Sequence, residues 1–192
     1  MKSALSRVFL SVMVFVLFLT GAVNVAHAAI AVQAPPISAF FEQNLTVPGG
    51  AIIPLIRFRL AQSSGSDTLT AVGLVMTAST TMAQGEIARV SLWRESGSRE
   101  GFQVDQDTFI AGAASTSPLF NTLVVLTPTT PVSIGSSSSE FYLVASTTAS
   151  GSLVDLHAFE PVLQANYAST SAGGIGAATD IGRRIIMSSN AS

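Results

Sequence analysis

Hydrophobic and polar side chains alternate along most of the chain beyond residue 50. In AIIPLIRFRLAQ (51–62) the even-numbered positions from Ile52 to Leu60 are apolar apart from Pro54, and Arg57 and Arg59 lie between them. A period of two predicts a half-buried β-strand, because successive side chains of a strand point to opposite faces. Pro54 lacks the amide hydrogen that a ladder needs, so we expect a bulge or a sheet edge there.

The alternation repeats at intervals of about ten residues. Residues 68–79 place Val72, Leu74 and Met76 on one predicted face, and residues 86–95 do the same with Ala88, Val90 and Leu92. Further strands are predicted at 107–115, 120–128, 130–135, 140–148, 152–163 and 179–189. Short Gly, Ser and Pro clusters separate them, and no helical period of 3.6 occurs beyond residue 28. This pattern predicts an all-β fold, an antiparallel β-sandwich.

The N-terminal segment, 1–28, differs from the rest of the chain. Lys2 and Arg7 precede an apolar run, 8–26, which is followed by the small residues of the sequence AHA ending at Ala28. This arrangement is typical of a secretory signal peptide cleaved after Ala28, and the alternative is a retained N-terminal membrane anchor. We therefore expect a secreted or cell-surface protein with a signal peptide at 1–28, an extended segment at 29–50 and a β-sandwich domain at 51–188.

The segment 29–50 contains Pro35-Pro36, which excludes a helix there. It also carries apolar side chains at Ile37, Phe40 and Phe41. An extended segment of this kind pairs either with an edge of its own sandwich or, as a donated strand, with the next subunit. Self-assembly is thus one expected kind of partnership, beside contacts with other cell-surface proteins.

Charge and cysteine content narrow the functional classes. Two of the nine basic residues lie within 1–28, which leaves seven scattered arginines, no lysine and eleven acidic residues. Nucleic-acid binding requires clustered basic residues, so we expect no nucleic-acid partner. The chain contains no cysteine, which excludes disulfides, thiol nucleophiles and thiolate metal sites.

The order of several segments is similar to that of the Ig- or fibronectin-like β-sandwich modules of secreted and cell-surface bacterial proteins. The similarity rests on IIPLIRFRLAQSSGSDTLTAVGLVMTA, EIARVSLWRE, DTFIAG and VSIGSSSSEFYLVAST, and it spans roughly residues 50–150. The resemblance implies a non-enzymatic structural or adhesive module at a cell surface, or a subunit of an extracellular assembly.

In such modules the acidic loop before the segment that here reads DTFIAG often resembles a calcium-binding loop, since hard cations take several oxygen ligands. The candidate ligands in this chain are Glu95, Glu100, Asp105 and Asp107. The chain departs from the pattern because Gly97 and Ser98 stand where further ligands belong, and Arg94 and Arg99 add positive charge. The loop is therefore either a weak calcium site or a solvated turn closed by its own salt bridges, and no other cofactor is expected.

Two further groups are candidates for a functional role. Trp93 lies on the polar side of its predicted strand, where it either stacks on a sugar ring as part of a carbohydrate-binding module or covers the end of the core. Asp155 and His157 share one face if residues 152–163 form a strand, but no nucleophile motif accompanies them. We therefore expect no enzymatic activity, with a carbohydrate-binding module as the alternative to the structural one.

Overall fold

The computed structural model describes most of the chain beyond residue 29. The described residues are 30–33, 45–62, 65–76, 80–82, 85–114, 123–149, 152–163, 168–171, 173–174, 176–177, 180–181 and 184–188. The expected signal peptide at 1–28 lies outside them, as do Pro35-Pro36 and the apolar residues at 37–41. Within the described part, no helix is long and apolar enough to span a membrane.

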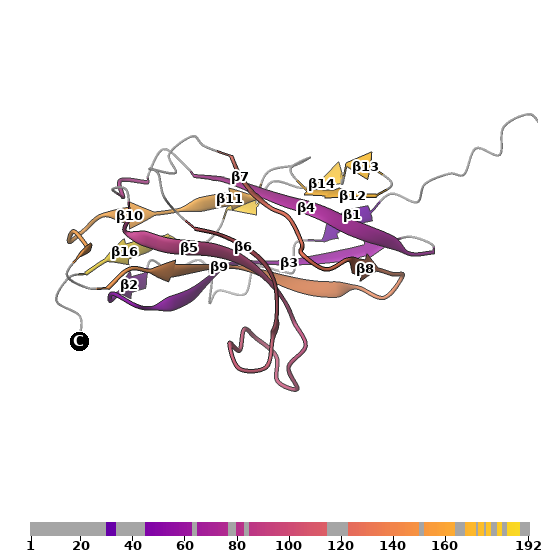
Figure 1. The fold of residues 1–192 in the computed structure, drawn as a ribbon, viewed down its shortest axis with the longest axis horizontal. Coiled ribbons are helices and arrows are strands. Elements are labelled where there is room, and N and C mark those ends of the chain that lie inside the picture. Colours follow the sequence, from indigo (N-terminus) through magenta and orange to yellow (C-terminus); the bar gives the residue numbers. More distant parts are fainter. Residues whose placement is uncertain are drawn as a thin grey trace, which may run out of the picture.

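One layer of the fold is a six-stranded sheet in the order β14-β1-β3-β9-β5-β6. Its strands are β14 (Gly176–Ala177), β1 (Ile30–Gln33), β3 (Ile52–Gln62), β9 (Ser139–Thr147), β5 (Ile87–Arg94) and β6 (Thr108–Ala114). The long central strands β3, β9 and β5 are antiparallel, whereas β1 and β14 are parallel. Figure 1 shows β3 and β9 in the lower part of the molecule and β4 above them.

The second layer is centred on β4. It contains β13 (Gly173–Gly174), β12 (Ala168–Thr170), β4 (Asp67–Met76), β11 (Pro161–Leu163), β15 (Asp180–Ile181), β7 (Val124–Leu126) and β8 (Val132–Ile134), with β7 and β8 both pairing with β4. A smaller sheet joins β10 (Ala158–Phe159), β16 (Ile185–Met187) and β2 (Leu45–Val47). The all-β fold expected from the alternating pattern is therefore confirmed.

The core lies between the two layers, where alternate side chains of the facing strands meet. Phe58 of β3 stacks on Phe141 of β9 with ring centroids 5.5 Å apart, and Leu143 and Leu92 are fully buried in the same core. The opposite layer contributes Val72, Leu74 and Met76, all at most 1% exposed, as the alternation predicts. Burial of apolar area on this scale is the main force that holds the two sheets together.

Two side chains depart from the predicted faces, and each lies beside a register shift. Ile52, expected on the buried face, is 49% exposed, because the pairing of β3 with β9 shifts between Pro54 and Ile56. Ala88 is exposed as well, because β5 shifts against β9 between Ile87 and Arg89. An extra residue in one strand exchanges the inward and outward faces, which a strict period of two does not anticipate.

The expected extended segment at 29–50 supplies two strands. Ile30–Gln33 pair antiparallel with residues 59–62 of β3 in the same chain, and Leu45–Val47 pair parallel with β16. Both strands thus extend sheets whose other members come from beyond residue 50.

Candidate functional site

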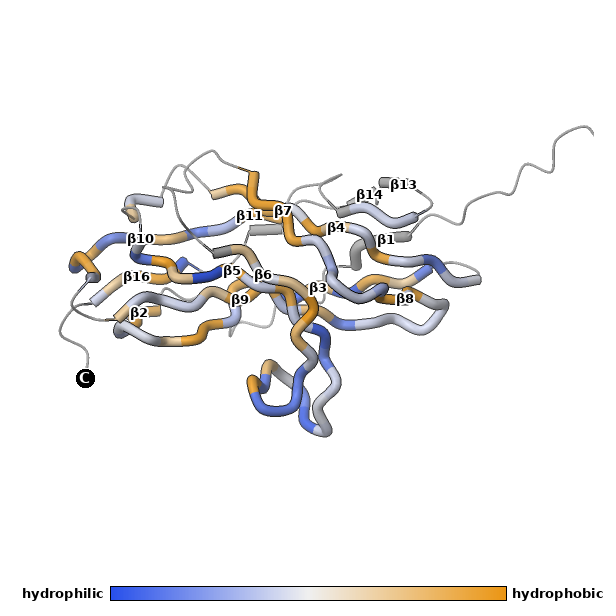
Figure 2. The backbone as a smooth tube through the Cα atoms, in the orientation of Figure 1, coloured by the Kyte–Doolittle hydropathy of each residue, from blue (hydrophilic) through white to orange (hydrophobic). Residues whose placement is uncertain are grey.

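The connection between β5 and β6 leaves the sandwich as a long hairpin, which we call the projection (residues 95–107). Figure 1 shows it extending away from both layers, and Figure 2 shows that it is predominantly hydrophilic with a short apolar stretch. The tryptophan and the four carboxylates singled out in the sequence lie in the projection or at its base. The projection and its base therefore form the candidate site.

A single carboxylate closes the neck of the projection. Asp107 is buried, and its Oδ1 accepts hydrogen bonds from the backbone amides of Ser96 at 3.1 Å and Gly97 at 3.2 Å. Its Oδ2 accepts a third bond, from the amide of Gln103 at 2.8 Å. Because a buried acceptor with three donors leaves little freedom to the loop that supplies them, Asp107 holds both arms of the hairpin at a fixed distance.

Gln103 fixes the turn at the far end of the projection. Its Nε2 donates to the carbonyl oxygens of Arg99 and Gly101, at 2.7 Å each. Gly101 has a φ of 101°, a conformation that residues with a Cβ rarely adopt. A Cβ at Gly97 would lie 2.7 Å from Gln103 Oε1, so any larger residue at position 97 would make the Gln103 side chain shift.

Aromatic rings attach the projection to the outer face of the six-stranded sheet. Phe102 packs edge-on against Trp93 of β5 and against Tyr142 of β9, with centroid distances of 5.4 and 5.7 Å. Trp93 also meets Phe109 of β6 edge-on at 5.4 Å. We call these four residues the aromatic ladder; such pairs stabilise beyond the area that they bury.

Trp93 itself is half-buried within this ladder. Its Nε1 donates to Ser91 Oγ at 2.9 Å, and a register shift between Leu92 and Trp93 lies on the side of β6. The edge-to-face contacts with Phe102 and Phe109 do not form a flat platform of parallel rings for a sugar. The structure thus brings Trp93 into the attachment of the projection, while Phe109 of the ladder is 42% exposed.

A cluster of charged side chains accompanies the ladder. Glu140 of β9 accepts hydrogen bonds from the Nε atoms of Arg57 and Arg59 of β3, the latter at 2.8 Å. Arg57 Nη2 also donates to Glu100 of the projection at 2.9 Å. The side chains of Arg57 and Glu140 are only 13% and 11% exposed, so this ion pair is screened less by solvent than a surface pair.

The Tyr142 hydroxyl lies between two carboxylates, those of Glu140 at 2.9 Å and of Glu95 at the start of the projection. Burial, with these two hydrogen bonds, raises the pKa of Tyr142 well above its usual value. Burial also raises the pKa of Glu95; the hydrogen bond from Tyr142 opposes this effect, and the negative charges of Asp107 and Glu140 add to it.

The arginines act in the opposite direction on Glu140. Burial alone would raise the pKa of this carboxyl, but the hydrogen bonds from Arg57, Arg59 and Tyr142 together hold it below its ordinary value. The hydrogen bond to Glu140 likewise raises the pKa of Arg57 against the effect of burial. Two glutamates beside one tyrosine therefore have pKa values shifted in opposite directions, because Glu140 has two cationic partners at hydrogen-bond distance.

The four carboxylates proposed as calcium ligands do not share a common partner. Asp107 accepts three backbone amides, Glu95 contacts Tyr142, and Glu100 pairs with Arg57. Asp105 is exposed. Among the described residues no group of three or more acidic, histidine or cysteine side chains is placed to hold a metal ion. The residues present thus do not fit a calcium site in this conformation.

His157 contacts a buried glutamate at the start of β5. Residues 152–157 do not form a strand, and Leu156 has a φ of 67°, so the shared strand face proposed for Asp155 and His157 does not exist. His157 Nδ1 instead lies 2.7 Å from Oε2 of the buried Glu86, whose Oε1 accepts the amide of Val154 at 2.7 Å. This contact fastens the loop before β10 to the start of β5.

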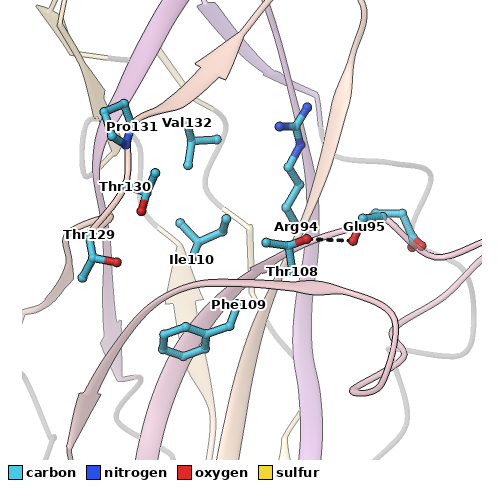
Figure 3. Close-up of a pocket in the computed structure, with 10 residues that line it drawn as sticks. Arg94, Glu95, Thr108, Phe109, Ile110, Thr129, Thr130, Pro131 and Val132 are labelled. Atoms are coloured by element: carbon cyan, nitrogen blue, oxygen red, sulfur yellow. Dashed lines mark hydrogen bonds between the residues drawn. The ribbon is translucent and has the colours of Figure 1, made fainter.

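A pocket of about 470 Å³ opens beside the base of the projection. One wall is formed by the end of β5 and the start of β6, and the other by residues 129–132, which lead into β8 and include its first residue. Figure 3 shows Thr129 and Thr130 on one side and Arg94 on the other, with Ile110 and Val132 between them. Sequence reasoning missed this pocket, because its two walls are far apart in the chain.

Comparisons with known proteins show the fold alone. The sequence matches no protein-family model, and no curated protein matches it significantly. Among solved structures, a chain described as Hadza microbial sialidase Hz136 is 12% identical with a TM-score of 0.52; the match covers 81% of this chain and 31% of that one. The chain thus spans about a third of the length of that sialidase.

Two further structures match more loosely. The sporulation control protein Spo0M from Bacillus subtilis is 11% identical with a TM-score of 0.31, covering 83% of this chain and 49% of that one. AvmM, described as catalysing macrocyclization in alchivemycin A biosynthesis, is 9% identical with a TM-score of 0.34, covering 79% and 88%. The described part of the protein is therefore an all-β sandwich that shares its fold with part of a sialidase chain.

Proposed function

We propose that the protein is an exported, non-enzymatic β-sandwich that acts as an adhesive or structural module at a cell surface, with the projection as its contact surface. The signal-like segment at 1–28 supports the export, and the order of the strand segments supports membership of the Ig- or fibronectin-like modules. In this proposal the module uses neither a metal nor a cofactor.

The observation that carries the proposal is the preformed shape of the projection. Asp107 fixes its neck and Phe102 attaches it to the sheet, while Val104 is 51% exposed and Arg99 and Asp105 are exposed in the same loop. A contact loop that is ordered before binding loses less conformational entropy when it meets a partner. Such a loop suits attachment better than a bare solvated turn does.

The test is attachment of the purified protein to envelopes of the cells that produce it, measured by co-sedimentation. We expect the wild type to sediment with the envelopes and a variant with residues 97–105 replaced by a short Gly-Ser turn to remain in solution. A double variant at exposed positions outside both the projection and the pocket, Ser136→Ala with Ser137→Ala, is the control and should sediment like the wild type. Equal sedimentation of all three proteins, or of none, would overturn the proposal.

A second candidate function, binding of a polysaccharide, is favoured by the pocket at the base of the projection. Small-ligand pockets usually enclose several hundred cubic ångströms. This pocket encloses about 470 Å³ and combines an apolar floor with hydroxyl groups. The sandwich shared with part of a chain described as a sialidase is compatible with this candidate. Retention of the protein on insoluble acidic and neutral polysaccharides tests it.

A further inference from the structure

We propose that the pocket beside Arg94 binds one saccharide unit that carries a carboxylate group. The inference rests on the second candidate function above, polysaccharide binding, and names the site and the chemical class of the sugar. It is independent of the contacts made by the far end of the projection.

The floor and rim of the pocket suit the apolar face of a sugar ring. Ile110 and Val132 are 8% and 5% exposed and form the floor, and the ring of Pro131 lies at the rim. The C–H groups of a pyranose pack on such surfaces, because removing apolar area from water is favourable.

Hydroxyl groups surround this apolar floor. Thr129 and Thr130 stand on one wall and Thr108 on the other, where its Oγ1 lies 2.9 Å from Ser96 Oγ. A hydroxyl donates one hydrogen bond and accepts others, as sugar hydroxyls do. Thr129 and Thr130 are both exposed, so both hydroxyls can exchange water for a polyhydroxylated ligand without rearrangement of the backbone.

Arg94 supplies the positive charge of the pocket. Its guanidinium carries several N–H donors. Its Nη2 donates to Ser139 Oγ at 3.0 Å, which positions the group and leaves other donors for a ligand. The acidic residue among the described lining residues, Glu95, directs its side chain away from the pocket in Figure 3 and contacts Tyr142. A guanidinium at the wall of such a pocket favours an anionic ligand, and its planar fork matches a carboxylate.

Calorimetric titration with single sugars tests the inference. The probes are glucuronate and N-acetylneuraminate, which carry a carboxylate, and glucose as the neutral control. We expect at least one acidic sugar to bind and glucose to bind at least about tenfold more weakly, the usual loss when a charged hydrogen bond is not made. Equal affinity for glucose, or failure of both acidic sugars to bind, overturns the inference.

Three variants test the location. Arg94→Gln is expected to weaken binding of the acidic sugar at least about tenfold, whereas Arg99→Gln, the same change of charge on the projection, leaves it unchanged. Thr130→Trp changes an exposed residue and fills the pocket, so it tests the site even if Arg94→Gln fails to fold. If Thr130→Trp binds the acidic sugar as tightly as the wild type, the sugar does not bind in this pocket.

The outcome for polysaccharide binding as a whole is read separately. If wild type and Thr130→Trp are both retained on an acidic polysaccharide, the protein binds saccharide elsewhere, and the inference falls while the second candidate function survives. If the protein is retained on no polysaccharide and binds no sugar, both the inference and the second candidate function are wrong.

Discussion

Phe102 of the projection and Tyr142 of β9 meet edge-to-face, with ring centroids 5.7 Å apart. The contact joins a loop residue to a fully buried side chain on a central strand of the sheet. Through this contact the charged loop between β5 and β6 packs against the sheet. The attachment of the projection should therefore respond to the removal of this one ring.

Phe102→Ala is expected to destabilise the protein by about 2 kcal/mol, roughly half the cost of removing a fully buried phenylalanine, because Phe102 is half-buried. This corresponds to a fall in melting temperature of about 4–8 °C. Val104→Ala, at an exposed apolar residue of the same loop, is the control and should change the melting temperature little. Equal effects of the two substitutions would show that the ring does not attach the loop.

Calcium is expected to leave the melting temperature unchanged between millimolar ion and chelator. A ligand that binds only the folded state stabilises it, by an amount that grows with the ratio of its free concentration to its dissociation constant. The Asp107 oxygens, however, are already engaged by three backbone amides. Differential scanning calorimetry in the two buffers makes the comparison. A rise of several degrees that disappears in Asp107→Ala would establish a calcium site in the projection.

Gly97→Ala is expected to destabilise the projection through Gln103. The new Cβ would lie 2.7 Å from Gln103 Oε1 and push away the side chain whose Nε2 holds the carbonyls of Arg99 and Gly101. A double-mutant cycle with Gln103→Ala measures the coupling. The cost of Gly97→Ala should be smaller in the Gln103→Ala background, and an unchanged cost would mean that the two residues do not compete for space.

Glu95→Gln is expected to alter how stability depends on pH. Because the pKa of Glu95 is raised in the folded protein, the folded state binds more protons than the unfolded state above the ordinary value of 4.5. The stability contributed by Glu95 is thus complete below that value and is lost as pH rises through the folded-state pKa. Replacement by neutral glutamine removes this loss.

Relative to the wild type, Glu95→Gln should therefore gain stability as pH rises above 4.5 and gain none at lower pH. Urea denaturation at several pH values measures the difference. Glu100→Gln is the control, because this side chain is 80% exposed. A constant difference between Glu95→Gln and wild type at all pH values would contradict the raised pKa.

The positions of the main strands along the chain, and most of their buried faces, were predictable because burial of one sheet face imposes a period of two on the sequence. The bulge at Pro54 was predictable as well, but its effect on Ile52 was not, since the side of the shift depends on pairing with β9. The ion-pair partners of the charged residues could not be predicted without knowing how β3 and β9 align. Arg59 lies opposite Glu140 only because of that alignment. The pocket was hidden for the same reason, because residues 129–132 face the base of the projection only after both layers have formed.

The last prediction concerns assembly through the N-terminal segment. In this structure Ile30–Gln33 pair with residues 59–62 of their own chain and with Gly176–Ala177 on the other side. A strand that already has two neighbours in its own sandwich offers little unpaired ladder to a second subunit. We therefore expect the chain from residue 29 onward to be a monomer by light scattering at high concentration.

Removal of residues 29–33 separates self-pairing from donation. With self-pairing, the shortened chain loses the hydrogen bonds along residues 59–62 of β3, so its melting temperature falls, and the exposed edge makes it more prone to associate. With donation to a neighbour, the longer chain is the polymer and the shortened chain is the monomer. The two alternatives predict opposite changes in mass on truncation, so one pair of light-scattering measurements decides between them.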